Sequence, residues 1–225
     1  MEAEISDRPY QAAIFDLDGV IVDTAKYHYL AWKRLAGELG FEFTEEQNER
    51  LKGVSRIRSL EILLEIGGLK LDQTQMAELA AKKNDWYLEY IDQLNESEIL
   101  PGVKEYLLRL KIDGIKIAVA SASKNARVIL SRLNIYELFD AIVDGNMVSK
   151  AKPDPEVFFC AARDLGVDPT QCIVFEDAEA GLKAAKRAGT KAIGIGRKES
   201  LKSADQVFES LAQVSRETDF WNISP

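Results

Sequence analysis

The sequence predicts an α/β protein whose parallel sheet is interrupted, after its first strand, by an inserted all-helical domain. Residues 12–15 form a short apolar run that is typical of a buried strand and ends in two acids. Residues 24–96 carry helical patterns with no convincing strand. From residue 97 onward, strand and helix patterns alternate, as in a parallel sheet. We therefore expect a discontinuous α/β core domain, residues 1–23 and 97–225, and a helical cap domain, residues 24–96.

Composition narrows the classes of function. The chain has 225 residues, a formal net charge of -8 and a sequence pI of about 4.9. This acidity argues against nucleic acid or an anionic membrane surface as a partner, because both favour basic patches. No apolar run approaches the roughly 18 residues that a membrane span needs. We expect a cytoplasmic monomer that acts on a small molecule.

The end of the first strand carries the first candidate site. Asp16, Asp18 and Gly19 follow the apolar run directly, at the edge where parallel sheets bind ligands. Two close carboxylates repel each other unless a cation lies between them or one holds a proton. The alternative is a solvated turn of the Asp-Gly type.

The cap is predicted to consist of helices only. Thr24 can cap a first helix, whose apolar residues recur at helical spacing until Gly40. Three more helices are expected at residues 44–51, 55–66 and 71–94, with breaks at Gly53 and at residues 67–68.

The second part of the core is predicted from alternating patterns. The expected strands are residues 116–120, 141–143, 172–175, 191–195 and, more weakly, 206–208. The expected helices are residues 103–112, 125–133, 155–165 and 179–188, the last ended by Gly189.

Two candidate anion-binding features follow strands of this region. The second strand runs into Ser121, Ala122, Ser123, Lys124 and Asn125, which offer hydroxyls, backbone N–H groups and an ammonium where a helix begins. The alternative is a serine-rich helix cap, which needs only one of these groups. Further on, Lys152 lies in a loop rich in proline, where a lysine is usually a solvated charge and Lys150 could take the same role.

A second predicted strand also ends in acidic residues. The apolar run at 172–175 leads directly into Glu176 and Asp177. Carboxylate and carbonyl oxygens from two strand ends suit a hard cation, and Mg2+ is the natural occupant beside phosphate. The alternative is that Asp177 merely caps the following helix, which leaves Glu176 unexplained.

These four features, in this order, resemble the haloacid dehalogenase (HAD) superfamily of phosphotransferases. The resemblance implies a HAD-like Rossmannoid core and an aspartyl-phosphate mechanism with Mg2+. It implies that Asp16 is the nucleophile and Asp18 the general acid and base, while Ser121 and Lys152 hold the transferring phosphoryl group. The Ala122 N–H is a further fixed positive group that could meet the charge of that phosphoryl group. The metal-binding residues that it implies are Asp16, Asp18 through its backbone carbonyl, Glu176 in support and Asp177.

Further motifs resemble the β-phosphoglucomutase family within this superfamily. They are residues 23–28, residues 51–56 followed by Ser59, and the whole 121–125 run. The resemblance implies that a second phosphate is bound by Arg56, Ser123, Lys124 and Asn125. It implies that Lys52, Gly53 and Ser59 sense the sugar from the cap, and that Thr24 and His28 help to switch Asp18 as the cap closes. The implied reaction converts β-D-glucose 1-phosphate to β-D-glucose 6-phosphate through β-glucose 1,6-bisphosphate.

Other interpretations of these residues stay open at this point. Lys52 and Arg56 could be solvated charges on a helix, and His28 could be structural. A HAD phosphatase acting on small sugar phosphates is the alternative enzyme. A non-catalytic phospho-aspartate switch is a third hypothesis, against which the retention of Asp18 argues.

Overall fold

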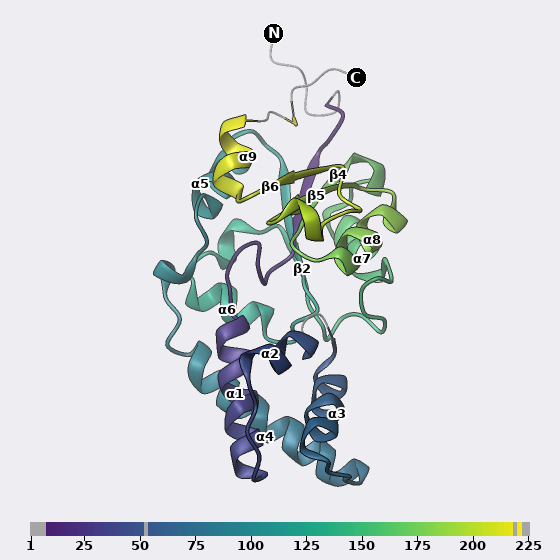
Figure 1. Ribbon diagram of the computed structural model, residues 1–225. Coiled ribbons are helices and arrows are strands. Elements are labelled where there is room, and N and C mark those ends of the chain that lie inside the picture. The colour runs from purple at the N-terminus through teal and green to yellow at the C-terminus, as the bar shows by residue number, and fades with distance from the viewer. Residues whose placement is uncertain (1–7, 52–53, 218–219, 222–225) are drawn as a thin grey trace. The chain divides into compact units, whose positions relative to one another are not determined.

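The computed structural model describes residues 8–51, 54–217 and 220–221 (Figure 1). The chain divides into two compact units. One contains residues 1–23 and 95–225 and is called the core unit here, and the other contains residues 24–94 and is called the helical unit. The chain enters and leaves the helical unit between the first and second strands of the core unit.

The core unit is built on one six-stranded sheet in which every neighbouring pair is parallel. The strand order is β3-β2-β1-β4-β5-β6, so the first strand in the sequence is central. The strands are β1 (Ala12–Phe15), β2 (Lys116–Ala120), β3 (Ala141–Val143), β4 (Cys172–Glu176), β5 (Lys191–Ile195) and β6 (Gln206–Phe208). The parallel sheet expected from the sequence is confirmed.

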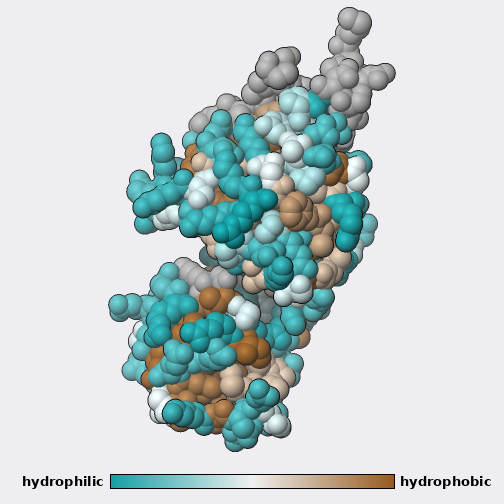
Figure 2. Space-filling view, turned by 90° about the vertical axis from the view of Figure 1, so that its right-hand side faces the viewer, coloured by the Kyte–Doolittle hydropathy of each residue, from teal (hydrophilic) through white to brown (hydrophobic). Residues whose placement is uncertain are grey.

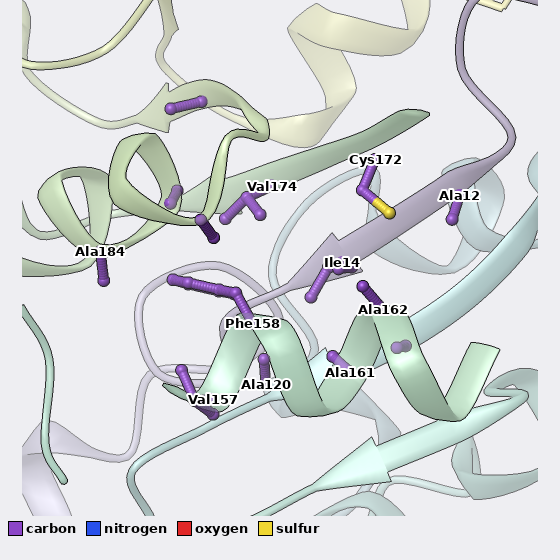
Figure 3. Packing of buried hydrophobic residues seen from close by; sticks show 14 of the residues in the cluster. Ala12, Ile14, Ala120, Val157, Phe158, Ala161, Ala162, Cys172, Val174 and Ala184 are labelled. Atoms are coloured by element: carbon purple, nitrogen blue, oxygen red, sulfur yellow. The ribbon is translucent and has the colours of Figure 1, made fainter. Parts of the chain in front are cut away.

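Helices cover both faces of this sheet, which explains why the central strands are apolar except at their ends (Figure 1). The α-helices are α5 (Val103–Ile112), α6 (Ala126–Arg132), α7 (Glu156–Leu165), α8 (Glu179–Ala188) and α9 (Leu211–Glu217). Phe158, Ala161 and Ala162 of α7 pack against strand residues such as Ile14 and Val174 (Figure 3). Short 3₁₀ turns lie at Glu96–Glu98, Tyr136–Leu138, Pro169–Gln171 and Lys198–Ser200.

The chain after β6 completes the other face of the sheet. Phe220 and Trp221 are buried, and the Phe220 ring lies 6.5 Å from that of Phe175 and 6.2 Å from that of Phe208. The sequence analysis did not predict α9 or this packing. The tail therefore has a structural role in the core.

The helical unit contains α1 (Ala25–Glu38), α2 (Glu45–Asn48), the 3₁₀ turn Glu49–Leu51, α3 (Arg56–Gly67) and α4 (Gln73–Ile91). Thr44 and Asp72 begin α2 and α4 with capping boxes. Thr24 precedes α1, but its side chain makes no capping bond. Its Oγ1 instead accepts a hydrogen bond from Tyr87 Oη at 3.1 Å, so Thr24 occupies the N-cap position expected for it but does not cap the helix through its side chain.

The surface is mainly hydrophilic on the face that Figure 2 shows, with hydrophobic residues scattered among polar ones. The exposed large hydrophobic residues described in the helical unit are Leu30, Val54 and Ile57. Among the described residues, no helix is both long and apolar enough to cross a membrane.

Candidate active site

Strand register brings three sequence-distant segments to one level at the carboxyl edge of the sheet. Phe15 of β1 pairs with Val119 of β2 and with Phe175 of β4. The next residue of each strand segment is therefore Asp16, Ala120 and Glu176, side by side. The Asp16 N–H donates to Phe175 O at 2.9 Å, which continues the ladder to this level.

Lys152 joins these three segments through its ammonium group. Lys152 Nζ donates to Asp16 Oδ1, to Glu176 Oε1 at 2.6 Å and to Ala120 O at 3.2 Å. The ammonium also lies 5.0 Å from the centre of the Phe158 ring in the core. Lys150, by contrast, is exposed and pairs with Asp154 at 3.6 Å. Lys152, and not Lys150, is the lysine of this site.

Electrostatics at this level are dominated by buried carboxylates. Burial raises the pKa of Asp16 well above its usual value, and although Lys152 opposes this shift, Glu176 and Asp177 add to it. Burial alone lowers the pKa of Lys152, but Asp16 and Glu176 outweigh it and raise that pKa. The two acids thus favour the charged form of Lys152, whereas burial and the neighbouring carboxylates disfavour the ionised form of Asp16.

Asp177 belongs to the same group of acids. Burial, followed by Glu176, raises the pKa of Asp177 to about 7, with a further contribution from Asp18. Gly19 adopts a φ of +82° beside it, and a Cβ at residue 19 would lie 2.0 Å from Asp177 Oδ2. Helix α8 is capped by Ala178, so the alternative that Asp177 serves as a helix cap is wrong.

The donor set of this edge fits Mg2+. Asp16, Asp177 and the Asp18 carbonyl offer hard oxygens, and a dication would relieve the repulsion between carboxylates that helps to raise the pKa of Asp16 and of Asp177. The set contains two carboxylate side chains and a carbonyl, with Glu176 committed to Lys152 and to the Ala178 N–H at 2.9 Å. Within the described residues, no group of three or more acidic, histidine or cysteine side chains forms a metal cluster.

The loop after β2 is arranged by its own serines. Ser121 is buried, its N–H donates to Val143 O at 3.0 Å, and its Oγ accepts from the Ser123 N–H at 3.0 Å. Ser123 Oγ in turn accepts from the Asn125 N–H at 3.2 Å. Helix α6 begins at Ala126, and its N-cap residue is Asn125, which makes no side-chain capping bond, so a simple serine cap is wrong. Ser121 follows Ala120 directly, which places it beside the Lys152 contacts.

The expected cap residues form a separate polar cluster inside the helical unit. His28 Nδ1 lies 2.8 Å from Lys83 Nζ, and the His28 ring stacks on Tyr87 at 4.0 Å. Burial lowers the pKa of His28 well below its usual value, and Lys83 and Arg56 lower it further. Burial, followed by Arg56, lowers the pKa of Lys83 to about 7. Lys83 and Arg56 thus lie close enough to disfavour the protonated form of His28, and Arg56 disfavours that of Lys83.

The other cap residues are only partly described. Ser59 is buried in α3, and Arg56 is the first residue of that helix. Burial lowers the pKa of Arg56, while Tyr87 and Asp85 oppose this shift. Lys52 and Gly53 lie outside the described residues, and so the sugar-sensing role expected of them stays a prediction.

Lys83 was missed by the sequence analysis, although the sequence contained a signal. Ala80, Lys83, Tyr87 and Ile91 are spaced by three or four residues along α4, and all are buried. A lysine at a core position of a helix is rare unless its charge has a partner or a task. The ammonium lies 4.6 Å from the Trp32 ring and 4.9 Å from the Tyr87 ring.

The parallel sheet with acids, serine and lysine at its carboxyl edge defines a phosphotransferase of the HAD type. Residues 13–195 match the family model described as haloacid dehalogenase-like hydrolase. The chain belongs to this family.

Comparison with individual relatives narrows the resemblance. The chain is 46% identical to a β-phosphoglucomutase from Bacillus subtilis over 92% of each chain. A crystal structure of a β-phosphoglucomutase from Clostridium difficile aligns with a TM-score of 0.87 and 42% identity, covering 92% of this chain and 94% of that one. The chain is also 35% identical to a phosphorylated carbohydrates phosphatase from Thermotoga maritima, over 81% of this chain and 83% of that protein.

Proposed function

We propose that this protein is a Mg2+-dependent phosphomutase that interconverts β-D-glucose 1-phosphate and β-D-glucose 6-phosphate. The observation that carries the proposal is the contact of Lys152 with both Asp16 and Glu176 at the carboxyl edge of the sheet. It holds a buried carboxylate beside a fixed cation, which is the arrangement that phosphoryl transfer to a carboxylate needs. The 46% identity to a β-phosphoglucomutase supports the choice of a mutase.

In the proposed cycle, Asp16 carries the phosphoryl group between the two ends of the sugar. Phosphorylated Asp16 gives its phosphoryl group to the 6-hydroxyl of β-glucose 1-phosphate, and Asp18 takes the hydroxyl proton. The product, β-glucose 1,6-bisphosphate, then reorients so that its C1 phosphate, in place of its C6 phosphate, lies beside Asp16. Asp16 then bonds the phosphorus at C1 while the bond to the C1 oxygen breaks, and Asp18 returns the proton to that oxygen. This transfer leaves Asp16 phosphorylated, as at the start of the cycle, and β-glucose 6-phosphate is released.

Fixed positive groups are proposed to stabilise each transfer. Lys152, the Ser121 hydroxyl and the Ala122 N–H face the charge that spreads over the equatorial oxygens of the phosphoryl group. Bound Mg2+ supplies further charge neutralisation, held by Asp16, Asp177 and the Asp18 carbonyl with support from Glu176. Ser123, Lys124 and Asn125 are proposed to bind the phosphate that is not transferred.

The helical unit is proposed to recognise the sugar phosphate. Arg56 and Lys83 lie close to His28, and an anionic substrate would relieve the repulsion that lowers the pKa of Lys83 and of His28. Arg56 is proposed to bind the second phosphate, whereas Lys52, Gly53 and Ser59 sense the sugar. Thr24 and His28 are proposed to couple closure of the cap to Asp18.

A phosphorus NMR time course tests the function. Wild-type protein receives Mg2+, β-glucose 1-phosphate and a trace of β-glucose 1,6-bisphosphate, beside an Asp16→Asn variant. We expect glucose 6-phosphate to accumulate only with the bisphosphate and only in the wild type. Without the bisphosphate, turnover should lack priming and be slow.

A phosphatase is the second candidate, favoured by the 35% identity to a phosphorylated carbohydrates phosphatase. Inorganic phosphate as the main product of the same time course, with no need of bisphosphate, would establish hydrolysis instead. The phospho-aspartate switch predicts a phosphorylated protein without turnover. The monomeric state and the cytoplasmic location remain predictions, and light scattering tests the first.

A further inference from the structure

The loop that carries Lys152 is held by a carboxylate outside the reacting groups. Glu156, the first residue of α7, accepts hydrogen bonds at Oε2 from the Lys150 N–H at 2.7 Å and from the Ser149 N–H at 3.0 Å. The Ser149 hydroxyl donates to the same carboxylate, at 3.1 Å from Oε1 and 3.0 Å from Oε2. Glu156 therefore binds the backbone two and three residues before Lys152.

The other side of Lys152 is held as well. Arg187 of α8 donates to Pro153 O at 2.8 Å, and the Asp154 side chain accepts from the Glu156 N–H at 3.0 Å. The loop is thus fixed on both flanks of Lys152. Its backbone is tied to α7 and α8, the two helices that pack on the sheet below the site.

We propose that Glu156 is a positioning residue for phosphoryl transfer, acting through the backbone of residues 149–150 on the ammonium of Lys152. A lysine side chain has many rotamers, and its ammonium meets Asp16, Glu176 and Ala120 together only if its Cα is fixed. Glu156 bonds the loop, and Lys152 bonds the acids. The inference rests on the proposed role of Lys152 in the transfer.

A purely structural role is the competing explanation. A glutamate in the first turn of a helix stabilises that helix through its dipole, whatever loop lies nearby. That role predicts a loss of stability without a specific loss of transfer rate. The experiment must therefore measure both quantities.

The test is the single-turnover rate at which Asp16 of the intact protein is phosphorylated by β-glucose 1,6-bisphosphate with Mg2+, measured by rapid quench. We expect Glu156→Ala to lower this rate about 100-fold, the effect of a displacement near 1 Å at a reacting group. KM should change far less. Glu156→Gln should recover most of the rate, because its amide oxygen can still accept both backbone N–H groups.

Asp168→Ala is the matched control. Asp168 clamps a turn in the same way, accepting from the Thr170 N–H at 2.9 Å and the Thr170 hydroxyl at 2.5 Å, before β4 begins. The Asp168→Ala variant therefore loses comparable hydrogen bonds, but at the start of β4, whereas Glu176 lies at the end of that strand. Its transfer rate should match the wild type even if its melting temperature falls.

A double-mutant cycle decides whether Glu156 acts through Lys152. In a Lys152→Ala background, Glu156→Ala should cause no further loss of rate. If transfer in that background is too slow to follow, the affinity for vanadate replaces the rate as the readout. Ser149→Ala, which removes only the hydroxyl bonds, gives a milder variant should Glu156→Ala not fold, and its smaller effect should vanish in the same background.

Three results would overturn the inference. They are an unchanged rate in Glu156→Ala, a Glu156→Gln rate as low as that of Glu156→Ala, and equal losses with and without Lys152. The wild-type reaction distinguishes failure of the positioning role of Glu156 from failure of the proposed phosphomutase function. If the wild type is not phosphorylated, the proposed function fails, whereas a phosphorylated wild type with unaffected variants rejects only the positioning role.

Discussion

A Cβ at Gly181 would lie 1.8 Å from Oε1 of Glu176, the carboxylate oxygen that also receives the Lys152 ammonium. Gly181 lies inside α8, where glycine destabilises a helix relative to alanine. The absence of a side chain at residue 181 therefore leaves the space that the Glu176 carboxylate occupies. Any larger residue at 181 must move the helix or the acid.

Gly181→Ala should lower turnover by about 10- to 100-fold, because the displaced carboxylate no longer holds Lys152 in place. Gly37→Ala is the matched control, since a Cβ at residue 37 of α1 meets nothing within 4 Å. That control should be about 0.5–1 kcal/mol more stable than wild type with unchanged turnover. Steady-state kinetics measure the turnover of each variant, and urea denaturation measures its free energy of unfolding. Normal turnover in Gly181→Ala would show that Glu176 needs no such space.

Lys83 should make stability depend on alkaline pH. Its folded pKa of about 7 lies below its usual 10.5, so between these values the unfolded chain binds a proton that the native protein does not. The free energy of unfolding should therefore rise with pH across this window, by up to about 1.4 kcal/mol per pH unit. Below pH 7 the destabilisation is complete, and above 10.5 it is absent.

Lys83→Met should remove this dependence. The variant should be more stable than wild type near pH 7, with a difference that shrinks toward pH 10.5, as followed by urea denaturation at several pH values. Lys82→Met, which changes an exposed neighbour, controls for loss of charge. Equal slopes for wild type and Lys83→Met would mean that Lys83 keeps its proton in the folded state.

Mg2+ should stabilise the protein through Asp177. A ligand that binds only the folded state raises the melting temperature as its concentration exceeds Kd. Asp177→Asn removes a proposed ligand, so its melting temperature should respond much less to added Mg2+. Asp164→Asn, at an exposed ion pair with Arg163, should respond like the wild type. A full response in Asp177→Asn would remove Asp177 from the metal site.

Phe220 should contribute to stability and not to catalysis. Its buried ring contacts Phe175 and Phe208, so Phe220→Ala should lower the free energy of unfolding by about 3–5 kcal/mol. Turnover at a temperature where the variant is folded should be unchanged. A large change in KM with normal stability would contradict this assignment.

The strands were predictable because their patterns are local. Five apolar runs bounded by turns gave five strands with the same bounds as in the structure, and only β4 extends one residue further, to Glu176. Residues 211–217 were missed because a seven-residue helix carries little periodic signal. The burial of Phe220 depends on partners far away in the chain, which a local pattern cannot supply.

The positions of the core acids, Ser121 and Lys152 could be predicted because each follows a strand or lies in a distinctive loop, and the structure brings Lys152 to Asp16 and Glu176, while their roles in transfer stay predictions. The roles of Glu156, Gly181 and Lys83 could not, because each depends on a contact between segments. Glu156 resembled any acid that begins a helix, and Lys83 resembled an exposed residue of a lysine pair. Only the folded register reveals which carboxylate meets which lysine.

The placement of β1 has a consequence for folding. The central strand comes from the start of the chain, and both of its neighbours, β2 and β4, lie beyond the inserted helical unit. Bringing them together requires closure of a long loop, and such non-local pairing is slow. Asp16 therefore meets Glu176 and Lys152 only when β1 has entered the sheet. Recovery of phosphoryl transfer during refolding should thus report the arrival of β1, later than the helical circular dichroism signal of the inserted unit.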